Sequence, residues 1–210
     1  MPPRPVPEIR WSTRDSDALA ARLRAFGMAI DPDGRIAFRS ATIRLVPDPG
    51  PDDRLTVAND PDKRPPTDQR RSRLADVLAV GWATVDRERV AAAMAPGDPG
   101  AVEPLPADAH LGAFVLRIGR SMPARLVVEP DTEGRLAATL ARIGEAPVAI
   151  YLSARPDGLA AYVAGVRSRG GAVSAIRPGP LGPSVILLGG PTWGPHLLVV
   201  ESRPASPRPT

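Results

Sequence analysis

The chain has 210 residues, and its 27 prolines and 19 glycines make up about 22% of them, just below the ~25–30% typical of low-complexity chains. An apolar fraction of 43% and a net charge of only +4 exclude the highly charged, weakly hydrophobic composition of a disordered protein and leave enough apolar residues for a core. Because the chain lacks cysteine, disulfides, thiolate nucleophiles and Cys-ligated metals are also excluded.

The distribution of charge and hydrophobicity limits the partners. Lys63 is the only lysine, and the arginines are scattered among 23 acidic residues, with aromatic residues at 4%. We therefore expect no nucleic-acid partner. The apolar runs are far shorter than the ~20 residues that span a bilayer, and the first residues, MPPRPVP, lack the apolar stretch of a signal peptide. We expect a cytoplasmic protein without a membrane partner.

Proline clusters divide the chain into regions. Residues 1–7 and 203–210 are predicted to be disordered, Pro-rich tails, and residues 59–76 are predicted to form a Pro-rich, charged linker. Two folded regions remain, an N-terminal unit at 8–58 and a pair of units at 77–202. Within the second region, the four prolines of residues 96–108 indicate a further connecting segment.

The N-terminal unit has the pattern strand, helix, then strands. Residues 8–15 alternate like a strand, and the spacing of Leu19, Leu23 and Phe26 predicts an amphipathic helix that ends at Gly27. The segments 34–40 and 41–47 follow as short strands, and 55–58 is compatible with another.

The same pattern returns twice, which is the most informative feature of the sequence. The motif Trp-x-Thr-x-Asp occurs at Trp11 and again at Trp82, each time before a helix. The further predicted elements are a helix after Asp86, strands at 111–119 and 124–130, a helix at 132–143, a strand at 147–153, a helix from Asp157 and strands at 184–190 and 196–202. The fold class is therefore α+β, built from repeated βαβββ units.

Two stretches resemble a known family. The segment LVVEPDTEGRLAATLARIGEAPVAIYL (126–152), with Gly144-Glu145, and the closing GGPTWGPHLLVVE (189–201) resemble the glyoxalase-like proteins of the vicinal oxygen chelate superfamily, closest in pattern to domains of the methylmalonyl-CoA epimerase type. The resemblance implies that the units form a curled, cup-like mixed β-sheet flanked by helices. It also implies one metal ion inside the cup, held by four residues on four strands, which polarises a substrate with adjacent oxygens.

The metal does not carry over to this chain. The four ligand positions of the family correspond to Ala79, Leu126, Ala149 and Val200, none of which has a nitrogen, oxygen or sulfur donor. We therefore expect a degenerate site with no metal and no cofactor. Glu8, which occupies the position of Ala79 in the first unit, is expected to be a solvated residue of a strand edge.

The lining of the cup predicts a ligand site instead. Alternation along the strands places six of the predicted ligand-binding side chains on the inner face, and a tryptophan lies at the mouth of the cup. These residues are Ala79, Leu126, Tyr151, Ser153, His196 and Val200 on the strands and Trp193 at the mouth. Such a lining suits a small, partly apolar molecule.

Two alternatives to this ligand site stay open. One is a filled core without a cavity, and the other is a glyoxalase- or epimerase-like lyase or isomerase with unconventional metal ligands or acid/base residues. No catalytic residue is assigned, His110 is expected at the surface, and sheet edges that need cover favour a homodimer.

Overall fold

The protein is described here by a computed structural model, in which residues 6–59, 72, 74–131, 133–155, 157–191 and 193–201 can be described. The predicted C-terminal tail, residues 1–5 of the predicted N-terminal tail and most of the predicted linker lie outside these residues. Val6, however, is buried, and the first strand begins at Pro7.

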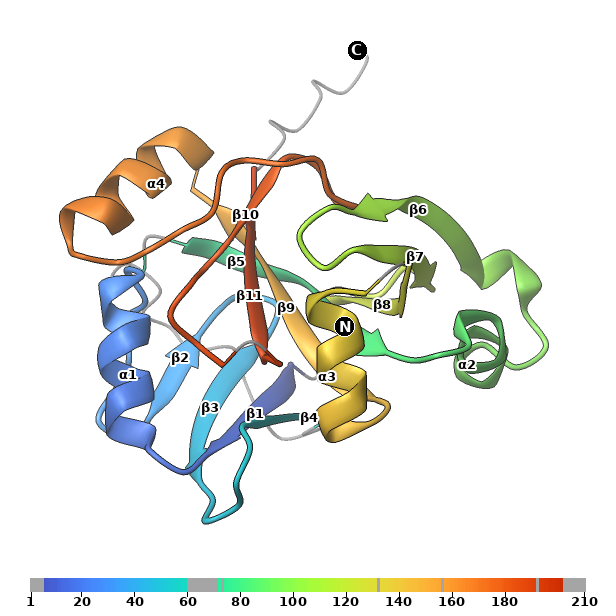
Figure 1. Ribbon diagram of the computed structural model, residues 1–210, viewed down its shortest axis with the longest axis horizontal. Helices are drawn as coiled ribbons and strands as arrows, with labels where there is room; N and C mark the ends of the chain where they lie inside the picture. The colour runs from blue at the N-terminus through green and yellow to red at the C-terminus, as the bar shows by residue number, and fades with distance from the viewer. Residues whose placement is uncertain are drawn as a thin grey trace, which may run out of the picture.

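The N-terminal unit forms a four-stranded sheet of its own (Figure 1). Its elements are β1 (Pro7–Thr13), α1 (Ser16–Ala25), β2 (Arg35–Ala37), β3 (Thr42–Pro47) and β4 (Arg54–Asn59). The strand order is β2-β3-β1-β4, with β1 parallel to β3 and antiparallel to β4. The three strands after α1 therefore do not form one meander, because β4 lies on the other edge of β1.

This arrangement corrects the prediction for Glu8. Since β1 lies between two strands, Glu8 is not at an edge but is buried, with 1% of its surface exposed. Arg10 Nε donates to Glu8 Oε1 at 2.8 Å, so the buried carboxylate is held by an ion pair.

The second unit has the full βαβββ order. It comprises β5 (Leu74–Ala83), α2 (Arg87–Met94), a short 3₁₀ turn (Pro99–Ala101), β6 (Val102–Asp108), β7 (Ala113–Ile118) and β8 (Ala124–Pro130). The segment at 96–108, predicted to be only a connection, thus contains a strand. Pro104 and Pro106 are tolerated there because β6 is the outermost strand, which pairs only with β7.

The third unit completes a seven-stranded sheet. It is preceded by α3 (Arg135–Ile143) and contains β9 (Ala146–Ala154), α4 (Leu159–Ser168), β10 (Ser184–Ile186) and β11 (His196–Val200). The order is β10-β11-β9-β5-β8-β7-β6, with the two units joined by the antiparallel pair β5–β9. The sheet is mixed and strongly curled, so the predicted α+β fold with a curled sheet and flanking helices is confirmed (Figure 1).

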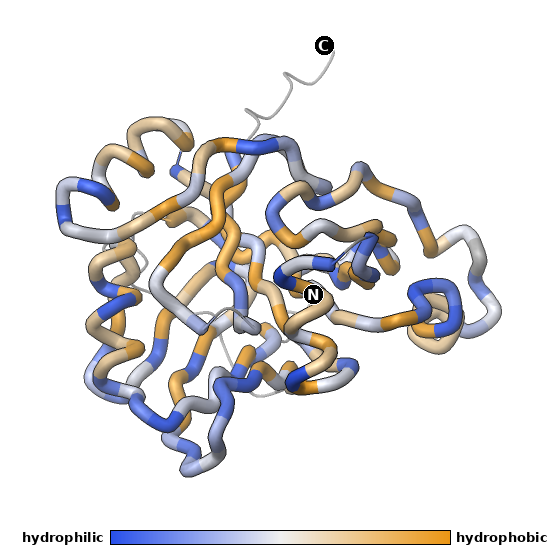
Figure 2. The backbone as a smooth tube through the Cα atoms, viewed as in Figure 1, coloured by the Kyte–Doolittle hydropathy of each residue, from blue (hydrophilic) through white to orange (hydrophobic). Residues whose placement is uncertain are grey.

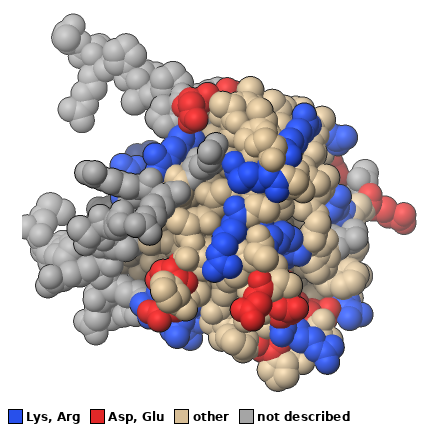
Figure 3. Space-filling view, turned by 90° about the vertical axis from the view of Figure 1, so that its left-hand side faces the viewer, with Lys and Arg blue, Asp and Glu red and all other residues tan. Residues whose placement is uncertain are grey.

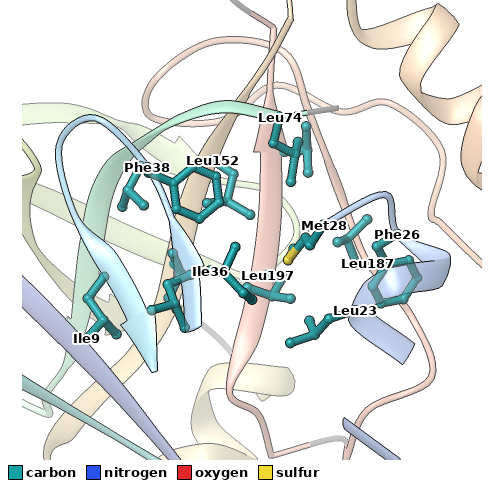
Figure 4. Packing of buried hydrophobic residues seen from close by; sticks show 14 of the residues in the cluster. Ile9, Leu23, Phe26, Met28, Ile36, Phe38, Leu74, Leu152, Leu187 and Leu197 are labelled. Carbon is teal, nitrogen blue, oxygen red and sulfur yellow. The ribbon is translucent and has the colours of Figure 1, made fainter. Parts of the chain in front are cut away.

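The largest core lies on the outer side of the curled sheet. In Figure 4, Phe38 of the β2–β3 turn lies beside Leu152, and Ile36 of β2 lies beside Leu197. Leu23 of α1 belongs to the same buried cluster. Hydrophobic residues follow the central strands in Figure 2, whereas the β3–β4 loop and α2 are rich in hydrophilic ones. The N-terminal unit therefore covers the outer face of β5, β9 and β11.

Helix α1 also packs beside α4. Tyr162 Oη donates to the carbonyl of Phe26 and Arg169 Nε donates to that of Ala25, each at 2.9 Å. Figure 3 shows the side of the molecule on which these helices lie, and its arginines are interspersed with acidic side chains. None of the helices in the described part of the chain is long and apolar enough to cross a membrane. That nucleic acids and membranes are not partners stays a prediction.

The repeated motif at Trp11 and Trp82 has a local structural role. In each unit the aspartate at its end caps the following helix, as Asp15 Oδ1 accepts from Ala18 N at 2.8 Å and Asp86 Oδ1 accepts from Arg89 N at 2.9 Å. A side-chain acceptor at this position satisfies a backbone N–H that the first turn of a helix leaves free. The repeat therefore fixes where α1 and α2 begin.

Candidate ligand-binding site

The inner face of the curled sheet carries the residues that the alternation pattern placed there. Ala79, Leu126, Ala149 and Val200 come from four different strands and belong to one buried cluster. The structure thus brings together the four positions that the sequence resemblance matched to the family's metal ligands. Their side chains are all hydrocarbon and do not fit a metal ion, which needs oxygen, nitrogen or sulfur donors. In the described ranges, no three His, Cys, Asp or Glu residues group in a way that could hold a metal.

The middle of the cup is filled. Tyr151 is fully buried there, and its Oη donates to Asp108 Oδ2 at 2.8 Å. Burial, followed by the charge of Asp108, raises the pKa of Tyr151 well above its usual range, so the hydroxyl stays protonated and serves as a donor. Opposite it, a Cβ added to Gly81 would lie 3.2 Å from Ala149 Cβ and 3.4 Å from Tyr151 Cε2. Packing this tight leaves no room for a ligand at Tyr151.

Asp108 organises the loop beside Tyr151, and no sequence motif marks this residue. The residue ends β6 and is fully buried, and its Oδ1 accepts from the backbone N–H groups of His110 and Leu111. The loop turns inward as a result, and His110 Nε2 lies 2.9 Å from the carbonyl oxygen of Ser184. His110 is only 9% exposed, so its prediction as a surface residue was wrong.

His196 and Trp193 lie at the end of the cup where β11 begins. His196 is 3% exposed, and its Nε2 is 3.1 Å from Thr139 Oγ1, which donates to the Arg135 carbonyl at 2.8 Å. Because the hydroxyl proton of Thr139 is already donated to this carbonyl, the neutral imidazole of His196 donates its Nε2–H to Thr139 Oγ1. Burial, with a smaller effect of the Arg135 charge, lowers the pKa of His196 to about 4. Near Trp193, the guanidinium of Arg142 lies 5.3 Å from the ring centroid.

The opposite end of the cup contains a cavity of about 530 Å³. All three units contribute to its wall, which consists of Arg39, Ala75, Asp76, Leu78, Arg117, Met122, Ala124, Ser153, Leu181 and Glu201. Of the seven residues predicted to bind a ligand, Ser153 is the one that lines this cavity. The cavity lies at the end of the inner face, whose middle is packed core, and binding of a ligand on this face stays a prediction.

One wall of the cavity is fixed by Asp76, which is 5% exposed. Its carboxylate accepts from Arg39 Nε at 3.1 Å, from Ser40 N at 2.8 Å and from Val77 N at 3.0 Å. Ser153 Oγ donates to the backbone carbonyl of Asp76 at 3.3 Å. Since Arg39 and Ser40 belong to the β2–β3 turn, the N-terminal unit both closes this wall and neutralises its charge.

Known proteins share this architecture, although no family model and no curated protein matches the sequence. The solved structure of methylmalonyl-CoA epimerase from Mycobacterium tuberculosis aligns with a TM-score of 0.53 at 17% identity, over 63% of this chain and 91% of that one. The chain has the glyoxalase-like fold. A Streptomyces coelicolor methylmalonyl-CoA epimerase variant in complex with 2-nitronate-propionyl-CoA aligns with a TM-score of 0.48 at 19% identity, over 62% of this chain and 99% of that one. At these identities the likeness establishes the fold and leaves the activity to be argued from the site.

Proposed function

We propose that this glyoxalase-like chain is a metal-independent binding protein for a small, partly apolar molecule, which it holds in the cavity at the end of its cup. The observation that carries the proposal is the cavity itself. Its volume of about 530 Å³ falls in the usual range for small-molecule sites, ~300–1,000 Å³.

The composition of the wall supports the same proposal. Leu78, Met122, Ala124 and Leu181 provide apolar surface, and a few charged and hydroxyl groups provide orientation. The four residues that the resemblance matched to metal ligands have only hydrocarbon side chains, so the proposed binding relies on these wall residues. His196 and Tyr151, whose side chains are the polar, ionisable ones of the predicted lining, are buried and are not among the residues that line the cavity.

The test fills the cavity from within. Ala124 is 2% exposed and its small side chain faces the cavity, so Ala124→Phe places a ring in the space that a ligand would occupy. The probe is N-phenyl-1-naphthylamine, a neutral and mostly apolar fluorophore. With the natural chain we expect a saturable, one-site enhancement of fluorescence. In the variant the affinity should fall at least about tenfold, because the new ring excludes the apolar probe from its contacts with the wall.

The matched control is Ala92→Phe, which places the same ring on the exposed side of α2. It should bind the probe like the natural chain, and thermal unfolding of both variants checks that they are folded. Should a folded Ala124→Phe chain bind the fluorophore as tightly as the control, or should the natural chain not bind it at all, the proposed site is wrong.

We also propose that the chain forms a homodimer through β4. This strand is an edge of the four-stranded sheet, and Val57 on it is 46% exposed. Among the described residues β4 pairs with β1 alone, and a terminal strand of this kind favours pairing with a second strand. Sedimentation should show a dimer that Val57→Lys dissociates and that Val85→Lys, at a 69% exposed position in a loop, leaves intact. A natural chain that sediments as a monomer at micromolar concentration would exclude the dimer.

A further inference from the structure

The cavity wall contains one arginine, Arg117, for which no ion pair is found among the described residues. Arg117 lies on β7, and alternation with Ala113 and Val115, both in the inner cluster, places its side chain on the inner face of the sheet. Its Nε is fully enclosed and has no hydrogen-bond partner among the described residues. The guanidinium of Arg117 lines the cavity without an acceptor from the described residues, so an acceptor supplied by a ligand to its accessible N–H groups would be favoured.

The other charged groups of the wall do not supply that acceptor. Asp76 is the buried carboxylate of the cavity, and donors from Arg39, Ser40 and Val77 already occupy it. Glu201 is exposed at the mouth, just beyond the end of β11, and no ion pair joins it to Arg117 in the described part of the chain. Its negative charge disfavours ligands with several negative charges, such as polyphosphates, because like charges in one site repel each other.

The apolar part of the wall completes the description of the ligand. Leu78 and Leu181 are half-buried, and Met122 is 52% exposed, so hydrocarbon surface surrounds the space beside Arg117. Methionine at a binding surface adapts to ligands of different shape. The wall therefore combines a single available cation with an apolar lining.

We propose that the cavity selects an organic monocarboxylate, whose carboxylate pairs with Arg117 while Leu78, Met122 and Leu181 cover its apolar body. The inference rests on the proposed function, because it names the class of molecule that the same cavity takes. A guanidinium and a carboxylate form short, charge-assisted and often paired hydrogen bonds, which gives both affinity and orientation.

The experiment compares three probes that share one chain and differ in one end group: hexanoate, hexanamide and hexylamine. Affinities are measured by ¹⁵N–¹H NMR titration of the full chain, with N-phenyl-1-naphthylamine as a separate neutral probe. We expect hexanoate to bind at least about tenfold more tightly than the amide or the amine, as a hydrogen bond to a charged group adds that much. Arg117→Gln should reduce hexanoate to the level of hexanamide and leave the fluorophore bound.

Arg120→Gln is the control, because it removes the same charge from an exposed position three residues away. It should bind hexanoate like the natural chain, and Arg117→Met provides a second variant if the glutamine variant unfolds. Equal binding of hexanoate and hexanamide, or unchanged binding of hexanoate to a folded Arg117 variant, would overturn the monocarboxylate while the fluorophore still reports a ligand site. Failure of all four probes would overturn both this inference and the proposed function.

Discussion

The buried imidazole of His196 makes the stability of the protein depend on pH. The ordinary pKa of histidine is 6.5, and burial lowers that of His196 to about 4. Between pH 6.5 and 4, His196 is therefore protonated in the unfolded chain but stays neutral in the folded chain. The contribution of this residue to stability is complete above pH 6.5 and is lost as the pH falls towards 4.

The magnitude follows from the same two pKa values. At pH 5 the unfolded imidazole is almost fully protonated and the folded one is still neutral, which removes about 2 kcal/mol of unfolding free energy relative to pH 7.5. Urea unfolding at the two pH values measures the change in the natural chain and in His196→Gln, which keeps a donor towards Thr139 but does not titrate. The natural chain should lose about 2 kcal/mol more than the variant between pH 7.5 and 5. Equal losses in both chains would refute the assignment of a buried, neutral imidazole.

Three further substitutions test two contacts inside the cup and one at the surface beside α2. Tyr151→Phe leaves Asp108 Oδ2 without its donor in the core, and urea unfolding should show a loss of about 1–3 kcal/mol. Glu145→Gln weakens the contact of this side chain with Arg89. The pKa of Glu145 is lowered to about 2, chiefly by its hydrogen bonds, so the carboxylate stabilises the folded chain at neutral pH. The variant should therefore melt at a lower temperature than the natural chain at pH 7, and this difference should shrink as the pH falls from 4.5 towards 2. Leu136→Ala opens a hole where α3 packs on the inner face, and denaturant titration should show a cost of about 2–5 kcal/mol; a cost below about 1 kcal/mol would mean that α3 is not part of this core.

The elements that repeat in the sequence were predictable from it. Asp15 and Asp86 cap helices as expected, because the cap is a local interaction between residues three apart. The inner-face positions Ala79, Leu126 and Val200 also came together as the alternation required. In a strand this alternation is a local property, and the pairing of strands preserves it.

What the sequence could not provide depends on contacts between distant segments. Pro104 and Pro106 predict an irregular connecting segment. The segment can form a strand because it lies at the edge of the sheet, where proline is tolerated, and its place at the edge depends on which strands pair with it. Likewise, the position of β4 beyond β1 made Glu8 internal, and Asp108 turned His110 inward. Each of these outcomes required the order of strands in the sheet.

The ligand site on the inner face stays a prediction, because the sequence pattern alone does not separate a cavity from a packed core. Small and apolar residues on one face of a sheet fit both a cavity and a packed core, and only three-dimensional packing distinguishes the two. The structure fills the middle of the cup with Tyr151 and opens its end at Ser153 and Ala124. No sequence motif marks Arg117, although its alternation with Ala113 and Val115 places it on the same face of the sheet.

The most direct test of this account is to locate the bound probe in the molecule. In a ¹⁵N–¹H NMR titration with hexanoate, the backbone signals that shift should be those around the cavity, at Leu78, Arg117, Ala124 and Ser153. Signals near His196 and Trp193, at the other end of the cup, should remain in place. Shifts concentrated at His196 and Trp193, or no saturable shifts at any position, would contradict a ligand site at the open end of the cup.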